Sequence, residues 1–356
     1  MNATSEIHDV HPYPCKFPAS SIVGFLEPAG STLLDPFCGS GTTIYEAALL
    51  GWDNVIGFDC NPIATLISRF KVMRVGKAFF CAAEQALLDF EKRKDALPMS
   101  ASLDFSGSDH WFSAPVRDDL RKIVPWIRTQ RDARIQLWLQ VSLSRIINRV
   151  SRQDGETRYV AVNKNIRAGD ALEYFRDSAE SLLRKLIDRP RISARVCVEL
   201  TNVRKGFPLK SASVDRIVTS PPYANTMDYY LYHKQRMNVL SFNFKVVQDA
   251  EIGSRHEFSS KRAGAAKWQQ DYDHTLSEIA RVLRVGGDAV VVIGDSQIAG
   301  RKIDAARLTQ SLVESKPLDF ELLDSTPLIG RSRSFSHAFQ RPNKFEHTIR
   351  LRRTGR

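Results

Sequence analysis

The sequence predicts an α/β protein whose mostly parallel sheet is doubly wound and carries an α-helical insert. Residues 31–43, STLLDPFCGSGTT, combine a short apolar strand, a glycine turn and the start of a helix. Residues 54–59, NVIGFD, give a second strand that ends on an acid, and Asn61-Pro62 starts a second helix. Between residues 76 and 190 the patterns are helical, and strands return near residue 195.

Five further strands follow the helical stretch, at 194–200, 213–220, 288–296, 319–325 and 346–353. The run DAVVVIGDS at 288–296 is typical of a buried parallel strand, whereas the last two strands lack a long connection and are expected to pair antiparallel. Helices are expected at 227–242 and 271–284, with a polar loop at 241–270 and Gly286-Gly287 as the stop of the second helix.

Length and pattern together predict one domain built from residues 1–75 and 191–356, into which residues 76–190 are inserted as helices. The chain has 51 Lys and Arg against 40 Asp and Glu, a net charge of +11. This excess favours a polyanionic partner, most simply nucleic acid, although a basic enzyme with another substrate has the same composition.

The compartment is expected to be the cytoplasm. No run of about 18 apolar residues predicts a membrane span. The first residues also lack the basic and apolar regions of a secretory signal. Five cysteines are scattered without a CxxC pair, which suits a reducing compartment and predicts no metal site.

The glycine turn CGSGTT is a candidate cofactor site. Gly39 and Gly41 let the backbone approach a ligand closely, and the turn leads into a helix N-terminus, which favours a negative group. It is neither a GxGxxG turn nor a P-loop, since no third glycine and no lysine follow. Asp59 ends the next strand about 20 residues later, where an acid accepts ribose hydroxyls. The plainer alternatives are an ordinary tight turn and an acid that caps the following helix.

The stretch IVTSPPY at 217–223 ends a strand on two prolines. The two rings fix two φ angles and remove two backbone donors, so the carbonyls beside them are held rigidly. A loop that merely starts with prolines is the alternative interpretation.

Taken together, HPYPCKFP at 11–18, LLDPFCGSGTT, TSPPY and LSEIARVLRVGGDAVVVIGDS resemble the S-adenosylmethionine-dependent DNA amino-methyltransferases of the N4-cytosine and N6-adenine type. The resemblance covers most of 8–75 and 195–352. It implies a seven-stranded, mostly parallel Rossmann-like methyltransferase sheet, S-adenosylmethionine as cofactor and double-stranded DNA as substrate. Residues 1–75 and 191–356 would then be the catalytic domain. The 76–190 insert matches no known DNA-reading module and is the candidate target-recognition region.

The resemblance also implies roles for single residues. Ser220 Oγ and the Pro221 carbonyl would hold the exocyclic amine of a base flipped out of the duplex, Pro222 would stiffen the corner, and Tyr223 would stack on the base. The cofactor would be held by Tyr13, Lys16, Phe17, Asp35, Phe37, Gly39, Gly41, Thr42, Thr43, Asp59 and Asn202. Asn202 departs from the family pattern, which has an acid at this position.

Four functions stay open. Serine at position 220 favours N4 of cytosine, with N6 of adenine as the alternative; an RNA methyltransferase and an inactive DNA-binding relic are the others. A C5-cytosine enzyme is disfavoured because the Pro-Cys pair, Pro14-Cys15, precedes the glycine turn. The setting would be a restriction-modification system with a cognate endonuclease, in the cytoplasm on nucleoid DNA. The sequence leaves the oligomeric state open.

Basic residues predict where DNA would bind. Arginines at helical spacing in the insert and basic residues in the expected loop are candidates for phosphate and base contacts: Arg145, Arg149, Arg152, Arg158, Lys261 and Arg262. The alternative for each is a solvated basic face.

Overall fold

The computed structural model describes residues 6–28, 30–99, 103, 105–156, 158–259, 265–298, 301–328 and 344–355. The chain divides into two compact units. We call Met1–Cys15, Pro62–Ile192 and Tyr230–Val246 the helical unit, and Lys16–Asn61, Ser193–Tyr229 and Val247–Arg356 the sheet unit.

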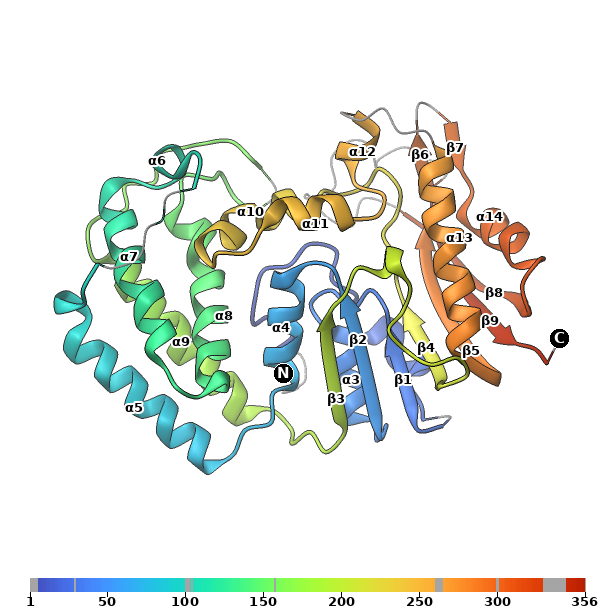
Figure 1. Cartoon of the computed structure of the whole chain (residues 1–356), viewed down its shortest axis with the longest axis horizontal. Coiled ribbons are helices and arrows are strands. Elements are labelled where there is room, and N and C mark those ends of the chain that lie inside the picture. Colours follow the sequence, from blue (N-terminus) through green and yellow to red (C-terminus); the bar gives the residue numbers. More distant parts are fainter. Residues whose placement is uncertain are drawn as a thin grey trace. The chain divides into compact units, whose positions relative to one another are not determined.

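The sheet unit is built on seven strands in the order β3-β2-β1-β4-β5-β9-β8 (Figure 1). The strands are β1 (Thr32–Asp35), β2 (Asn54–Asp59), β3 (Arg195–Leu200), β4 (Val214–Thr219), β5 (Leu283–Gly294), β8 (Leu318–Pro327) and β9 (Phe345–Arg353). The first five run parallel, while β9 pairs antiparallel with both β5 and β8. The prediction of seven mostly parallel strands ending in an antiparallel pair is confirmed, and this is the sheet that the resemblance implied.

The strand order reverses between β1 and β4, and this reversal positions the site. Ligands of open parallel sheets bind outside the carboxyl ends of the strands at such a switch point. All four residues of β1 are buried, because helices cover both faces of a parallel sheet. The buried core joins Leu34, Ile217, Val291 and Ile349 from four neighbouring strands. The ends of β1, β4 and β5 are thereby fixed along one edge.

Helices of the sheet unit are α2 (Ala19–Ile22), α3 (Thr42–Leu49), α12 (Arg255–Ser259), α13 (Ala265–Val282) and α14 (Ala305–Val313), with the short turns η1 (Val23–Phe25) and η3 (Val203–Lys205). Helix α11 (Phe244–Ala250) begins in the helical unit and continues into the sheet unit from Val247. Helix α13 packs through Trp268, Tyr272, Leu276 and Ile279, which recur every three or four residues and so share one face. A two-stranded hairpin, β6 (Ser296–Ile298) and β7 (Arg301–Ile303), follows β5.

The helical unit contains α4 (Pro62–Val72), α5 (Lys77–Arg93), η2 (Lys94–Ala96), α6 (Ser108–Trp111), α7 (Ala114–Thr129), α8 (Ala133–Val150), α9 (Asp170–Asp188) and nearly all of α10 (Tyr229–Val239). Helix α8 packs against α4, α5, α7 and α9, and Trp138 at its centre is fully buried. The helices expected between 76 and 190 are confirmed. The unit also takes in 62–75 and 230–246, which lie outside that stretch.

Two expectations about the C-terminal part are wrong. Residues 241–270 are not a long loop, because Val247, Ala250 and Ile252 are buried and turn a polar-looking stretch into α11 and α12. Residues 260–264 lie outside the described residues.

Gly286-Gly287 do not stop a helix either. Helix α13 ends at Val282 and the two glycines lie inside β5. A Cβ at Gly287 would lie 2.7 Å from the backbone oxygen of Asp215, so glycine allows β5 to pass close to β4 where their register shifts. Among the described residues, no helix is both long and apolar enough to cross a membrane.

Candidate active site

The glycine turn connects β1 to α3 with two left-handed residues. Gly39 has φ 51° and Gly41 has φ 79°, conformations that cost a residue with a Cβ about 1–2 kcal/mol. The Gly41 N–H donates to the Cys38 carbonyl at 2.7 Å, and the Cys38 N–H donates to the Phe58 carbonyl of β2 at 2.9 Å. The turn is therefore tied to the neighbouring strand, and Thr42 and Thr43 start α3 as buried residues.

Asp59, at the end of β2, lies beside this turn. Its two carboxylate oxygens each accept one backbone N–H, from Gly39 at 2.9 Å and from Asn61 at 2.8 Å. The Cys60 N–H also stabilises the ionised carboxylate. A carboxylate has about four acceptor positions, so capacity for a ribose hydroxyl remains. The half-buried side chain thus fits the ribose of a nucleoside cofactor, and it also caps the residues that follow. Burial raises the pKa of Asp59 to about 6.

Asp35 links the turn to the diproline corner. Its Oδ1 accepts from Thr219 Oγ1 at 2.7 Å and from the Phe37 N–H at 3.1 Å. Thr219 is the last residue of β4 and precedes Ser220, so one buried carboxylate fixes the ends of two adjacent strands. Burial raises the pKa of Asp35 to about 6, although Thr219, Phe37 and Thr43 all stabilise its ionised form.

The diproline corner is held from two sides. Trp268 Nε1, on α13, donates to the Pro222 carbonyl at 3.2 Å. The Tyr223 hydroxyl donates to Glu346 Oε1 on β9 at 2.7 Å, and Ser220 Oγ lies 3.5 Å from the same hydroxyl. Within the described residues no donor binds the Pro221 carbonyl, and Ser220 is half-buried. An acceptor carbonyl and a hydroxyl thus lie together at the switch point.

The other predicted cofactor residues fall in different places. Lys16, Phe17 and Phe37 are half-buried residues of the sheet unit. Asn202 follows β3 and accepts the Arg204 N–H at 3.1 Å, so it caps the turn η3. Tyr13 belongs to the helical unit, where its ring lies 5.1 Å from that of His233.

The predicted DNA-contacting arginines are largely engaged within the helical unit. Arg145 donates to Ser181 Oγ, and Arg152 donates to the carbonyls of Asp109 and His110. Arg149 lies over the Tyr174 ring at 3.6 Å, and Arg158 pairs with Asp154 at 2.7 Å. Arg149 and Arg158 remain exposed. Lys261 and Arg262 lie outside the described residues.

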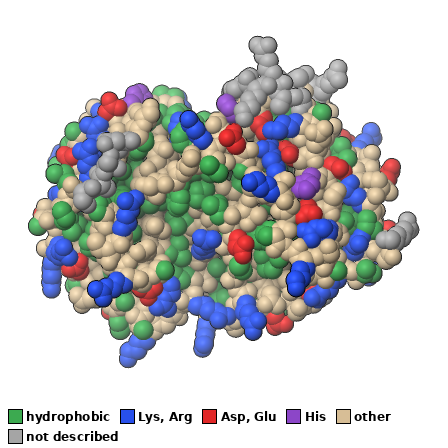
Figure 2. All heavy atoms as spheres, in the orientation of Figure 1, with side chains coloured by type: hydrophobic (Ala, Val, Ile, Leu, Met, Phe, Trp, Pro, Cys, Tyr) green, Lys and Arg blue, Asp and Glu red, His purple; other side chains and the backbone are tan. Residues whose placement is uncertain are grey.

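Two polar side chains near these arginines, of types capable of base contacts, are buried. Asn148 is bonded to Glu156, and Gln153 is bonded to the Gly155 carbonyl. On the face drawn in Figure 2, Lys and Arg are spread among Asp and Glu, so that face has no single basic patch.

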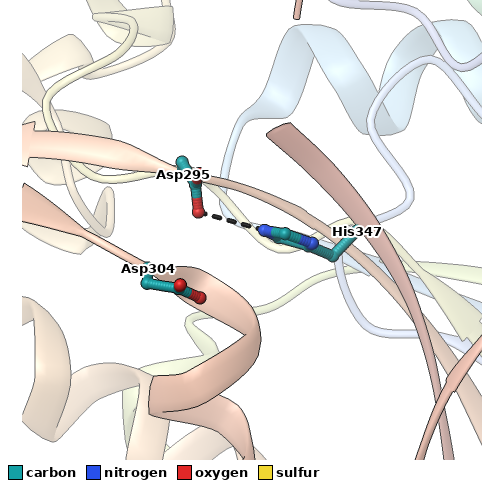
Figure 3. A group of neighbouring side chains, drawn as sticks. All are labelled: Asp295, Asp304 and His347. Atoms are coloured by element: carbon teal, nitrogen blue, oxygen red, sulfur yellow. Dashed lines mark hydrogen bonds and ion pairs between the residues drawn. The ribbon is translucent and has the colours of Figure 1, made fainter. Parts of the chain in front are cut away.

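Asp295, Asp304 and His347 bring potential metal-ligand atoms within 4.8 Å of one another (Figure 3). Protein donors already occupy this group. Asp295 accepts from His347 Nε2 at 3.0 Å and from the N–H groups of Ala305 and Phe345, and it pairs with the Lys302 ammonium at 2.9 Å. His347 Nδ1 is bonded to Ser325 Oγ at 2.8 Å. With both ring nitrogens and a lysine engaged, the group is a hydrogen-bonded clamp between β5 and β9.

Sequence reasoning missed Glu346, Trp268 and Asp295. Glu346 is 123 residues from Tyr223 and Trp268 is 46 residues from Pro222, so no local pattern relates them. Only the pairing of β9 with β5 brings the carboxylate to the corner.

Comparisons with known proteins find similarity to methyltransferases. Residues 26–93 match the family UPF0020, described as an RMKL-like methyltransferase domain. The chain is 21% identical over 397 residues to the type II methyltransferase M.MjaII of Methanocaldococcus jannaschii, which covers 83% of this chain and 73% of the relative. It is 23% identical over 320 residues to the type II methyltransferase M.BsoBI of Geobacillus stearothermophilus, covering 77% of this chain and 60% of the relative.

Among solved structures, the rRNA methyltransferase aviRa from Streptomyces viridochromogenes matches with a TM-score of 0.37 and 13% identity, over 98% of this chain and 92% of that one. A TM-score this low adds nothing about the substrate, and the strand order of the sheet remains the basis for the fold.

Proposed function

We propose that this chain, which belongs to the S-adenosylmethionine-dependent methyltransferases, transfers a methyl group to the exocyclic amine of a base flipped out of DNA, namely N4 of cytosine. The observation that carries the proposal is the rigid corner Ser220–Tyr223, linked through Thr219 and Asp35 to the glycine turn. The two type II methyltransferases at 21% and 23% identity support DNA as the substrate.

Asp59 and the turn would hold the cofactor. The remaining acceptor capacity of Asp59 suits a ribose hydroxyl. The start of α3 suits the cofactor carboxylate because helix N-termini favour anions. When bound, S-adenosylmethionine supplies a sulfonium methyl, an activated electrophile. The remaining task of the protein is to orient an amine toward that methyl group.

Ser220 and Pro221 would provide this orientation. The exocyclic amine of a base is a poor nucleophile because its lone pair is delocalised into the ring. A Pro221 carbonyl that has no donor within the described residues can accept one amine hydrogen and favour a pyramidal nitrogen. The Ser220 hydroxyl can donate to the ring N3 of cytosine. Tyr223 offers an aromatic ring on which the base stacks.

The test is methyl transfer followed by nucleoside analysis. Purified protein and labelled S-adenosylmethionine are incubated with unmethylated DNA, the DNA is digested, and the nucleosides are identified by mass spectrometry. We expect 4-methylcytosine, and transfer lost in Ser220→Ala with cofactor affinity retained. Formation of 6-methyladenine alone would replace cytosine by adenine as the target.

Transfer to RNA but not to DNA would contradict the substrate class. DNA binding without transfer by the wild-type protein would indicate an inactive relic. A cognate restriction endonuclease is the partner that we expect for such an enzyme, and protection of methylated DNA from a co-encoded nuclease would test it.

A further inference from the structure

We propose that Glu346 is a positioning residue that fixes the Tyr223 ring for the incoming base; this inference rests on the proposed function. The Tyr223 hydroxyl donates to Glu346 Oε1 at 2.7 Å. A hydroxyl bonded to a carboxylate at this separation is one of the stronger hydrogen bonds of proteins. Tyr223 lies in the loop after β4, beyond any strand pairing, so the orientation of its ring depends on such side-chain contacts.

The strand next to Glu346 supports the ring itself. Gly294 is the last residue of β5 and is paired in register with Glu346 of β9. A Cβ built at Gly294 would lie 2.6 Å from Cε2 and 2.7 Å from Cδ2 of Tyr223, closer than real contacts allow. The absence of a side chain at 294 therefore makes room for one side of the ring. Two residues paired across adjacent strands hold the ring and its hydroxyl together.

Glu346 is itself held in place by the clamp of Figure 3. The Asp295 carboxylate accepts the N–H of Phe345 at 3.1 Å and bonds His347 Nε2 at 3.0 Å, and these are the residues on either side of Glu346. The Asp295 N–H in turn donates to the Phe345 carbonyl at 2.8 Å. Three contacts thus fix the backbone from which the Glu346 side chain projects.

Preorganisation of the ring has a kinetic consequence. If the ring were free, the bound base would have to order it at the moment of stacking, at the cost of rotamer entropy. With the ring fixed, this cost is met during folding. Loss of the anchor should therefore raise KM for DNA or lower kcat while cofactor affinity stays unchanged, because none of these contacts involves the glycine turn or Asp59.

A double-mutant cycle between Tyr223→Phe and Glu346→Ala tests the inference. We expect Glu346→Ala to lower kcat/KM for DNA by about 10-fold or more, the usual effect of losing a hydrogen bond to a charged group. In the Tyr223→Phe background the same substitution should have no further effect, since the hydroxyl is already gone. Glu346→Gln retains an acceptor and should stay within a few-fold of wild type. Gly294→Ala should also lower kcat/KM for DNA. Adding Glu346→Gln to Gly294→Ala should not restore kcat/KM.

Glu321→Ala is the matched control, because this exposed glutamate of β8 pairs with Arg350. Its kcat/KM should equal that of the wild-type protein. Unchanged activity in Glu346→Ala, or equal losses in both backgrounds, would overturn the positioning role while leaving the proposed function intact. A wild-type protein that methylates no DNA would remove the proposed function, and this inference with it. Cofactor affinity, measured by calorimetry, separates either result from a general loss of folding.

Discussion

Two aspartates at strand ends, Asp35 and Asp59, lower the stability of the folded protein as the pH rises. Asp35 is buried and Asp59 is half-buried, and burial raises the pKa of each to about 6. Because these pKa values are higher in the folded than in the unfolded chain, the folded state binds more protons between pH 4 and 6. Each aspartate therefore makes the protein less stable as the pH rises through this range.

Asp59 predicts a pH-dependent cofactor affinity. If the ionised carboxylate accepts the ribose hydroxyls, affinity for S-adenosylmethionine should fall below pH 6, by up to about tenfold per pH unit. Asp59→Asn should bind about 10-fold or more weakly at pH 7 and should lose this dependence, because an amide does not titrate. Isothermal titration between pH 5 and 7 measures both effects. The same pH dependence in the variant would assign it to another group, with Asp35 the first candidate.

At the scale of elements, two glycine variants distinguish the effect of backbone strain on stability from an effect on cofactor binding. We expect Gly41→Ala and Gly51→Ala to lower the free energy of unfolding by about 1–2 kcal/mol each, since both glycines have positive φ. Gly51 lies in open space at the end of α3, away from the turn. Only Gly41→Ala should weaken the binding of S-adenosylmethionine. Denaturant titration and calorimetry of both variants measure this, and equal cofactor affinity in the two would exclude the turn as the cofactor site.

The clamp between β5 and β9 predicts a different pH dependence. Burial opposes ionisation of Asp295, but hydrogen bonds from His347, Ala305, Lys302 and Phe345 outweigh it and lower its pKa to about 2. A lowered pKa stabilises the fold above the unfolded value near 4, and this contribution is lost as the pH falls from about 4 to 2.

Asp295→Asn should therefore cost about 2 kcal/mol at pH 7 and about half as much at pH 3. Asp304→Asn is the control, because Asp304 caps α14 from an exposed position. Denaturant titration at the two pH values gives the comparison. A metal-dependent rise in the melting temperature, abolished by Asp295→Asn, would instead identify the group as a metal site.

The same elements show what sequence reasoning reaches. Strands β1 and β2, the glycine turn and the start at Pro62 follow from local patterns, because propensity, turn chemistry and burial agree there. Gly286-Gly287 led to a wrong prediction of a helix stop, because a helix stop and a close approach of two strands both favour glycine. The contacts of Tyr223 with Glu346 and Gly294 depend on which strands pair, and a single sequence does not encode that pairing locally.

At the scale of the whole molecule, the net charge of +11 bears on binding only through the positions of the basic residues. Several arginines of the helical unit already make contacts within the fold. Arg152 holds the carbonyls of Asp109 and His110, and Arg145 is bonded to Ser181. Arg149 lies over the Tyr174 ring and Arg158 pairs with Asp154, but both remain exposed. Of these arginines, Arg149 and Arg158 are therefore the better candidates for contacts with DNA, because their side chains are exposed.

This distinction predicts how the arginines of the helical unit differ. Arg149→Ala and Arg158→Ala should each weaken DNA binding and reduce the slope of log affinity against log salt by about 1, because each neutralises one phosphate. Arg152→Ala should instead lower the melting temperature, since it removes two hydrogen bonds to backbone carbonyls. Arg307→Ala, on the sheet unit and 88% exposed, removes the same charge and serves as the control. Fluorescence anisotropy with a DNA duplex over a salt series gives the slopes. If Arg307→Ala reduced the slope as much as Arg149→Ala, the effect would reflect net charge alone, and Arg149 would lose its assignment as a DNA contact.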